Sequence, residues 1–162
     1  MELDRIDVAL LSELCANGRA THVELSEKVG LTSTACARRI EKLEECGVIT
    51  GYAAVLGLRR LGLSNTVMVR ITLDSQSEEA LRAFEAAVAE SESVVQCFLM
   101  SGNDDYVLTV LVSGIEDFER VHKTELSRLP RVARLRSSFA MREIVNRAFP
   151  AAALNRLRRP VR

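Results

Sequence analysis

The sequence lacks the features that would place it among membrane proteins or general nucleic-acid coating proteins. No run approaches the ~18 apolar residues of a membrane span, and the N-terminus lacks a signal-peptide pattern. The formal net charge is zero, with 22 basic and 22 acidic residues. A protein that coats DNA indiscriminately needs a general positive charge, so a nucleic-acid role here requires a localised basic patch.

The residues that usually carry metal or covalent chemistry are few. The four cysteines form no CxxC pair and no zinc spacing. Cys15, Cys36 and Cys97 lie in mostly apolar segments, so they are predicted to be small buried side chains in a reducing cytoplasm. His122 falls on an apolar helical face and is expected to be packed there. No nucleophile–base pair, metal cluster or phosphate-cradling loop is found, so no catalytic residue, metal or cofactor is predicted.

Residues 21–47 predict two helices joined by a very tight turn. Thr21 and Glu24 form a capping-box pattern that begins the first of these helices. Gly30 supplies the conformation that ends it without strain, and Thr32 is the N-cap of the second helix. This arrangement is typical of a protein that presents one helix to the major groove of DNA.

The second of these helices is predicted to end at Gly47 and to have two distinct sides. The buried side carries Cys36, Ile40 and Leu43. The outward side carries Thr34, Arg38 and Lys42. An arginine on that side can bind guanine with two hydrogen bonds or hold a phosphate. The predicted DNA-binding residues are Thr32, Ser33, Thr34, Arg38, Arg39 and Lys42.

The basic residues of this helix have alternative interpretations. Its charged side chains can also be an ordinary solvated helix face. Arg39 borders the buried side, so a phosphate contact or a local salt bridge suits it better than reading a base.

The chain is predicted to have an N-terminal domain over residues 1–50 and a connecting segment over residues 51–65. Asp4 can cap a first helix that runs to about Ala16, which makes the N-terminal domain a three-helix unit. The stretch from Val48 to Leu56 is predicted to be strand-like.

Residues 66–145 predict a second domain of the α+β class with a βαββαβ, ferredoxin-like order. The expected strands are 67–73, 93–101, 106–112 and 132–145, with a hairpin turn at 102–104. The expected helices are one capped between Ser75 and Ser77 and one from Ile115 to about Leu129. Leu81, Phe84 and Val88 are expected to face the core.

The sheet of this domain is predicted to be apolar on both faces. The second strand would carry Val95, Cys97 and Leu99 on one face. It would carry Val94, Gln96, Phe98 and Met100 on the other. An exposed apolar face marks an association surface, so at least a homodimer is expected. A two-fold dimer would place two DNA-reading helices about one duplex turn apart.

The chain resembles the Lrp/AsnC family, the feast/famine regulators of bacteria and archaea, from Leu3 to about Val145. In the first domain the matching residues include Leu3-Asp4-Arg5-Ile6-Asp7, Glu24-Leu25-Ser26, Val29-Gly30-Leu31, Arg38-Arg39-Ile40 and Gly47-Val48-Ile49. In the second they include Ser101-Gly102, Asp105-Tyr106-Val107-Leu108 and Arg128-Leu129-Pro130. The resemblance implies a cytoplasmic, nucleoid-associated transcriptional regulator that binds double-stranded DNA and a small amino acid. It also implies dimers that assemble into an octamer or a similar ring.

The resemblance assigns an effector motif to Gly102, Asn103, Asp104, Asp105 and Tyr106. It places Ser138, Phe139 and Ala140 of the last strand near the same pocket. An amino acid needs an anion near its ammonium group, which Asp104 or Asp105 can supply, and donors near its carboxylate. The alternative is that Asn103 and Asp104 simply form a favourable turn.

Two other functions remain as alternatives. Sirohaem decarboxylases share this two-domain layout, but they carry histidine-rich stretches in the second domain, where this chain has only His122. A DNA-organising protein with little sequence preference is the other alternative, and the neutral net charge counts against it. The basic tail, residues 146–162, is predicted to be a loose solubilising end or a second phosphate contact.

Overall fold

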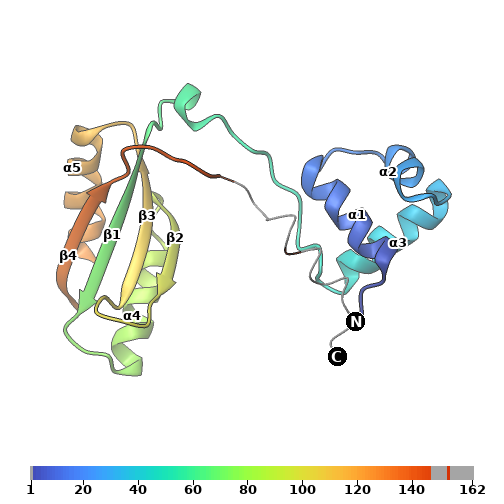
Figure 1. The fold of residues 1–162 in the computed structure, drawn as a ribbon. Coiled ribbons are helices and arrows are strands. Elements are labelled where there is room, and N and C mark those ends of the chain that lie inside the picture. The colour runs from blue at the N-terminus through green and yellow to red at the C-terminus, as the bar shows by residue number, and fades with distance from the viewer. Residues whose placement is uncertain (1, 147–152, 154–162) are drawn as a thin grey trace. The chain divides into compact units, whose positions relative to one another are not determined.

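The computed structural model describes residues 2–146 and residue 153 (Figure 1). Its folded part divides into an N-terminal unit, which extends to Val55, and a second unit, Leu56–Ile144. The expectation for the basic tail therefore falls outside the described residues, except at residues 146 and 153. None of the helices in the described part has the length and apolar content needed to cross a bilayer.

The N-terminal unit contains the three predicted helices. They are α1 (Arg5–Ala16), α2 (His22–Val29) and α3 (Ser33–Glu45). The carboxylate of Asp4 caps α1 by accepting hydrogen bonds from the N–H groups of Ile6 and Asp7, both at 2.8 Å. The third helix ends two residues before the expected Gly47, which adopts a left-handed φ of 69°.

A small apolar core holds these helices together. Its buried members are Val8, Leu10, Leu11, Leu25, Cys36, Ile40 and Leu43. Burial raises the pKa of the Cys36 thiol, and the prediction of a buried Cys36 is confirmed. The same prediction is wrong for Cys15, which is exposed because it lies in the last turn of α1, where this small core gives way to solvent.

The strand predicted between Val48 and Leu56 does not form. A strand needs a neighbour to accept and donate its backbone hydrogen bonds, and the described residues provide none beside this segment. Ile49 packs against the core of the N-terminal unit, whereas Val48, Val55 and Leu56 are exposed, Val55 by 95%. The hydroxyl of Tyr52 donates to the Glu44 carboxylate at 2.8 Å. Tyr52 is 56% exposed, but partial desolvation of its hydroxyl and this bond raise the pKa of Tyr52 to about 12.

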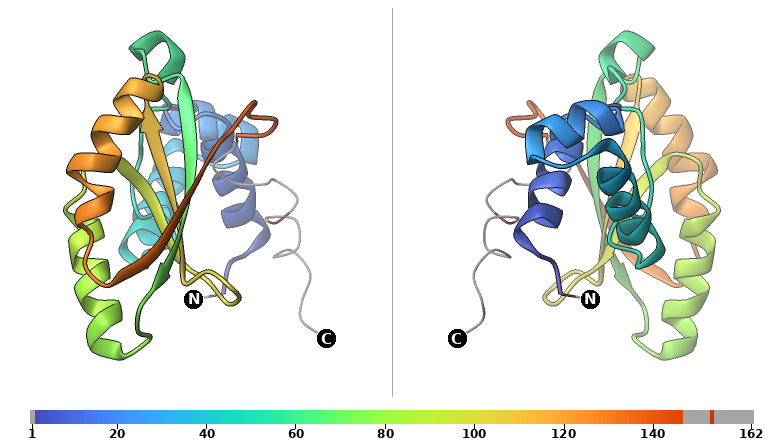
Figure 2. Two further views of the ribbon diagram at one scale, coloured as in Figure 1. Left: turned by 90° about the vertical axis from the view of Figure 1, so that its left-hand side faces the viewer. Right: turned by 90° about the vertical axis from the view of Figure 1, so that its right-hand side faces the viewer.

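The second unit has the predicted βαββαβ order. Its elements are β1 (Asn65–Leu73), α4 (Glu78–Ala89), β2 (Val94–Leu99), β3 (Tyr106–Val112), α5 (Ile115–Thr124) and β4 (Val132–Phe139), with 3-10 turns at Leu58–Leu61 and Leu126–Arg128. The sheet is antiparallel with strand order β2-β3-β1-β4. Both helices of this unit, α4 and α5, cover one face of the sheet (Figure 2). The other face, which neither of these two helices covers, is here called the open face.

The expected ends of the last strand and of the second helix are wrong. The last strand stops at Phe139 instead of residue 145, because β1, its neighbour in the described sheet, begins only two residues before the Val67–Phe139 pair. The second helix ends at Thr124, and a 3-10 turn continues to Arg128. The second helix begins at Ile115 as predicted, and the side chain of Ile115 is 68% exposed.

The core of the second unit lies between the sheet and the two helices. Its buried members include Val67, Val69, Ile71, Phe84, Val88, Tyr106, Leu108, Val110, Phe118 and Val121. Phe84 and Val88 are buried as predicted, while Leu81 is only partly buried. His122 is half-buried, with its ring 6.0 Å from that of Phe118.

A β-bulge changes the expected faces of the edge strand β2. The register shifts between Val94 and Gln96, so Val94 packs against the helix-side core and not on the same face as Gln96 and Phe98. Cys97 is exposed, contrary to the prediction, because it lies on β2, which is an edge strand of the described sheet.

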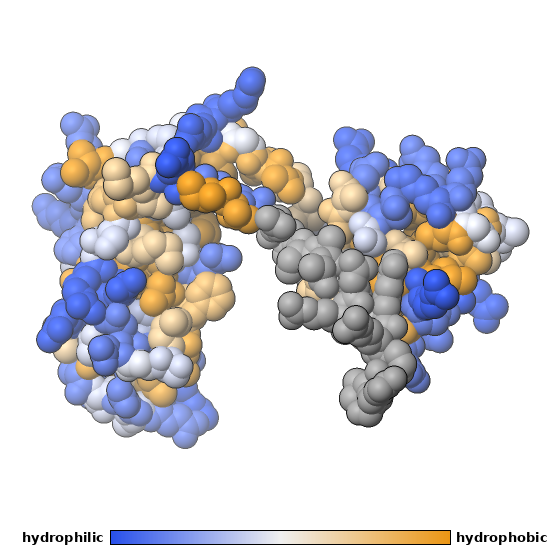
Figure 3. All heavy atoms as spheres, viewed as in Figure 1, coloured by the Kyte–Doolittle hydropathy of each residue, from blue (hydrophilic) through white to orange (hydrophobic). Residues whose placement is uncertain are grey.

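The open face is only partly apolar, which corrects the expectation that both faces of the sheet are apolar. Its apolar side chains are Met68, Phe98, Val107 and Leu111. Its arginines are Arg70, Arg134 and Arg136, which come from β1 and β4. Figure 3 shows hydrophobic and hydrophilic residues side by side on the surface of this unit.

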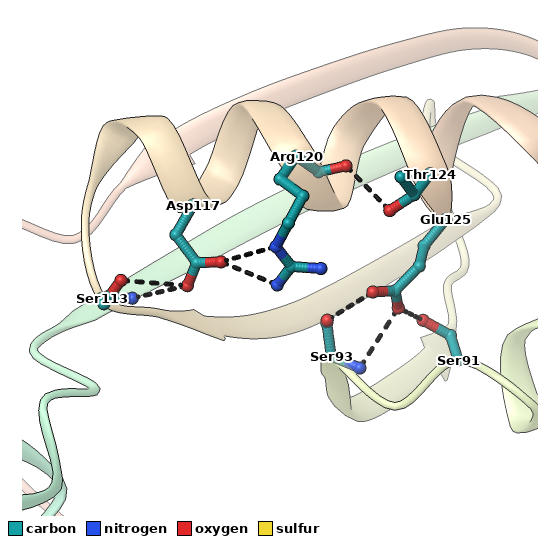
Figure 4. Close-up of polar contacts among 7 residues, drawn as sticks. All are labelled: Ser91, Ser93, Ser113, Asp117, Arg120, Thr124 and Glu125. Carbon is teal, nitrogen blue, oxygen red and sulfur yellow. Dashed lines mark hydrogen bonds and ion pairs between the residues drawn. The ribbon is translucent and has the colours of Figure 1, made fainter.

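Two carboxylates fix the ends of α5 (Figure 4). At its start, Asp117 accepts a hydrogen bond from the N–H of Ser113 at 2.9 Å and pairs with Arg120. At its end, the Glu125 carboxylate accepts bonds from the hydroxyls of Ser91 and Ser93 and from the N–H of Ser93. Burial alone would raise the pKa of Glu125, but these hydrogen bonds together lower it.

We expect Glu125→Gln to lower the free energy of unfolding by about 1–3 kcal/mol at neutral pH, because the amide nitrogen cannot accept the serine donors. The folded pKa lies below the ordinary glutamate value of about 4.3. The contribution of Glu125 is therefore complete above that pH and is lost as the pH falls through the folded pKa. Urea denaturation of both proteins across this range measures the effect.

Glu119→Gln, at an exposed position of the same helix, is the matched control and should leave stability nearly unchanged. A difference between wild type and Glu125→Gln that stayed constant on acidification would contradict the role given to the charge.

Candidate DNA-binding and effector-binding sites

The turn between α2 and α3 has the predicted geometry. Thr21 and Glu24 form the reciprocal capping box, with the N–H of Thr21 2.7 Å from the Glu24 carboxylate. Gly30 adopts the left-handed conformation (φ 71°, ψ 38°) that ends α2. The hydroxyl of Thr32 then accepts from the N–H of Ala35 at 3.2 Å and begins α3. The two helices are therefore held in a defined helix-turn-helix arrangement.

The outward side of α3 is accessible. Thr34, Arg38 and Lys42 are all exposed, while Cys36, Ile40 and Leu43 are buried on the opposite side. The predicted rotation of this helix is thus confirmed. Thr32 is also exposed, and Ser33 is half-buried beside it. These side chains form a compact polar and basic surface, here called the α3 surface.

Arg39 is engaged within its own unit. Its Nη1 lies 2.7 Å from a carboxylate oxygen of Asp4 and 2.7 Å from one of Asp7. The N–H of Asp7 lowers the pKa of the Asp4 carboxyl most, and Arg39 lowers it further. The local salt bridge that the sequence left open for Arg39 is therefore present, and it ties α3 to the start of α1.

The positive charge of this unit is local. Residues 1–50 contain nine acidic and six basic residues. The last turns of α3 carry Glu41, Glu44 and Glu45, all exposed. The side of α3 that carries Arg38 and Lys42 is therefore the part of this helix that can attract a phosphate backbone.

The hairpin between β2 and β3 is fixed from within by Asp105. This residue is only 7% exposed, and its two carboxylate oxygens accept from the N–H of Leu73 at 2.7 Å and from the Gln76 amide at 2.8 Å. Tyr106 is buried against the ring of Phe84, and its hydroxyl donates to Glu85 at 2.7 Å. Burial and this bond raise the pKa of Tyr106.

The tip of the hairpin is open to solvent. Gly102 and Asn103 are exposed, and among the described residues no intrachain hydrogen bond is donated by the N–H groups of residues 102–104. Asp104 forms an ion pair with Arg136 of β4. Arg136 is not among the site residues predicted from the sequence. The alternation of Arg134 and Arg136 in the last strand places two positive charges on one face and could have indicated it.

The two halves of the predicted effector site do not meet within one chain. Asp104 lies at the end of the sheet where Ile71 pairs with Tyr106. Ala140 donates to the carbonyl of Thr66 at the opposite end, at 2.8 Å. Ser138 lies on the open face opposite Met68. The ring of Phe139 instead contacts Phe118 on the helix side, with ring centroids 5.3 Å apart.

Comparison with known families agrees with both units. Residues 3–50 match a family described as winged helix-turn-helix DNA-binding, and residues 66–148 match the Lrp/AsnC ligand binding domain. The chain belongs to the Lrp/AsnC family. It is accordingly a DNA-binding transcriptional regulator with an amino-acid-binding domain of the Lrp/AsnC type.

Similar proteins cover nearly the whole chain. A proline dehydrogenase transcriptional activator of Rhodobacter capsulatus is 40% identical over 149 residues, which is 92% of this chain and 97% of that protein. A leucine-responsive regulatory protein of Haemophilus influenzae is 38% identical and covers 88% of this chain and 86% of its own length. A Neisseria meningitidis regulator solved in complex with L-Met superposes with a TM-score of 0.87 at 32% identity, covering 94% of this Lrp/AsnC chain and 99% of the other.

We expect Arg39→Gln to lower the free energy of unfolding of this unit by about 1 kcal/mol, because it removes both ion pairs to α1. Arg38→Gln, one residue earlier and without such an ion pair, should change stability by less than about 0.5 kcal/mol. Thermal denaturation of the two variants measures the contrast. Equal stability of the two would mean that the Asp4 and Asp7 contacts contribute nothing.

Proposed function

We propose that the chain regulates transcription by placing the α3 surface in the major groove of a specific operator. The observation that carries this proposal is the exposure of Thr34, Arg38 and Lys42 on a helix whose opposite side is buried. Arg38 and Lys42 supply donors for guanine or phosphate, and the neighbouring Ser33 is small enough to allow close approach. We assign Thr32 and Arg39 to phosphate contacts, with Arg39 first held by its two aspartates.

We infer that a free amino acid binds at the exposed hairpin tip. The amide groups of Gly102, Asn103 and Asp104 can donate to its carboxylate, and Asp104 can accept from its ammonium group. Asp105 and Tyr106 then support the hairpin from inside, since both oxygens of Asp105 are already occupied. The L-Met complex of the Neisseria meningitidis regulator supports an amino-acid ligand for a related fold.

We infer that the working molecule is a homodimer that assembles further into an octamer or a similar ring. Two apolar regions support a second copy: the open-face side chains of β2 and β3, and the exposed segment around Val55. A second copy could also bring its Ser138, Phe139 and Ala140 close to the hairpin of the first chain. One ligand could contact both sets only if they come from different chains.

Each proposed function belongs to one segment of the chain. We assign DNA binding to residues 1–50, connection to residues 51–65, and oligomerisation and effector binding to residues 66–145. We infer a location at the nucleoid in the cytoplasm, because chromosomal DNA is the proposed partner. We infer no catalytic role, because the relatives described above are regulators and His122 packs against Phe118.

A low-specificity DNA-organising role is the second candidate. The acidic surplus of residues 1–50 counts against it, since sequence-independent binding depends on many phosphate contacts. A steep salt dependence with poor discrimination between sequences would favour that candidate.

We expect Arg38→Ala to weaken operator binding by about 1–3 kcal/mol per subunit contact, because the guanidinium loses a base or phosphate partner. Gel-shift titration on the DNA upstream of the protein's own gene measures it. Arg82→Ala, on an exposed position of α4, is the control and should leave affinity unchanged. An unaltered affinity for Arg38→Ala would remove the α3 surface from the interface.

We expect the effector and DNA to influence each other equally. A coupling of about 1–3 kcal/mol in either direction is typical, and thermodynamic linkage requires the two shifts to match. Calorimetric titration of the amino acid with and without operator DNA, combined with DNA titration with and without the amino acid, tests this. Unequal shifts would be incompatible with one coupled equilibrium.

A further inference from the structure

Three arginines gather at the hairpin end of the open face. Arg70 of β1 lies directly opposite Arg136 of β4, and Thr72 lies opposite Arg134. Arg134 and Arg136 are two residues apart on one strand, so both side chains lie on the same face. Directly opposite residues have Cβ atoms about 4.5–5.5 Å apart, and like charges there repel. We call Arg70, Arg134 and Arg136 the arginine patch.

The arginine patch has more positive charge than the chain neutralises. Asp104 pairs with Arg136. Within residues 2–146, no carboxylate lies within 4.0 Å of the guanidinium of Arg70 or Arg134. All three arginines are exposed. The guanidinium groups of Arg70 and Arg134 and the carboxylate of Asp104 thus all lie at the hairpin end of the sheet. The N–H groups of residues 102–104 are at the same end.

We propose that the effector of this protein is an acidic amino acid, of the aspartate or glutamate type. This inference rests on the proposed effector function of the hairpin. Such a molecule carries two carboxylates and one ammonium group at neutral pH. The carboxylates match Arg70 and Arg134, which form charge-assisted and often two-pronged hydrogen bonds with carboxylates. The ammonium group matches Asp104. A neutral amino acid has a single carboxylate and leaves one guanidinium without an anion.

Binding of an acidic amino acid also relieves the repulsion within the arginine patch. The ligand brings negative charge between like charges that the sheet holds together. Selectivity over the corresponding amide then has a physical cause, because asparagine and glutamine offer no second anion to the patch.

Isothermal titration of the full-length protein against aspartate, glutamate, asparagine, glutamine and methionine tests the inference. We expect one of the two acids to bind about tenfold or more tightly than its amide. Arg70→Gln and Arg134→Gln should each weaken that acid about tenfold. Arg82→Gln, on the helix that covers the other face, should have no effect. Thermal midpoints of both patch variants should be unchanged or higher, since each removes a repelling charge.

Several outcomes would overturn the inference. Binding of a neutral amino acid with no preference for an acid would refute it and leave the effector proposal intact, whereas no binding of any amino acid would remove both. Equal affinity for glutarate and glutamate would identify a plain dicarboxylate site. Patch variants that lose the dimer in sedimentation experiments, with unchanged ligand affinity, would assign the arginines to subunit contact.

Discussion

The burial of Cys36, Ile40 and Leu43 fixes the rotation of α3, and the rest of the DNA-binding unit depends on that constraint. These three side chains pack against α1 and α2, so the opposite side of the helix must face solvent. The tight turn at Gly30 sets where α3 begins. The ion pairs from Arg39 to Asp4 and Asp7 then brace the helix against α1. A small core thereby holds a basic surface in place on a unit that is acidic in total.

A single buried carboxylate has a comparable role in the second unit. Asp105 joins the β2–β3 hairpin to the end of β1 and to the loop that precedes α4. The hairpin tip is left exposed while its base is rigidly held, which is the arrangement expected where a ligand must find preoriented amide groups. In the proposed effector motif, Asp105 would therefore support the site without touching the ligand.

The open face combines two kinds of surface. Its apolar residues on β2 and β3 favour contact with another chain, whereas its arginines on β1 and β4 attract anions. Association and ligand binding would then use adjacent parts of one sheet. A change at one part can affect the other through the shared strands, which suits a regulator that must couple ligand binding to assembly.

The sequence alone determined the features that depend on local chemistry. The caps at Asp4, Thr21 and Thr32, the turn at Gly30 and the alternation in β3 each predict their structure because neighbouring residues provide the necessary contacts. Tertiary structure decided what depends on distant neighbours. Among the described residues the segment 48–56 has no neighbouring strand, β4 stops beside the beginning of β1, and the bulge at Val94 moves that side chain to the helix side of the sheet. The occupied oxygens of Asp105, the ion pair of Asp104 and the meeting of Arg70 with Arg136 likewise depend on strand register, which residue spacing within one segment does not encode.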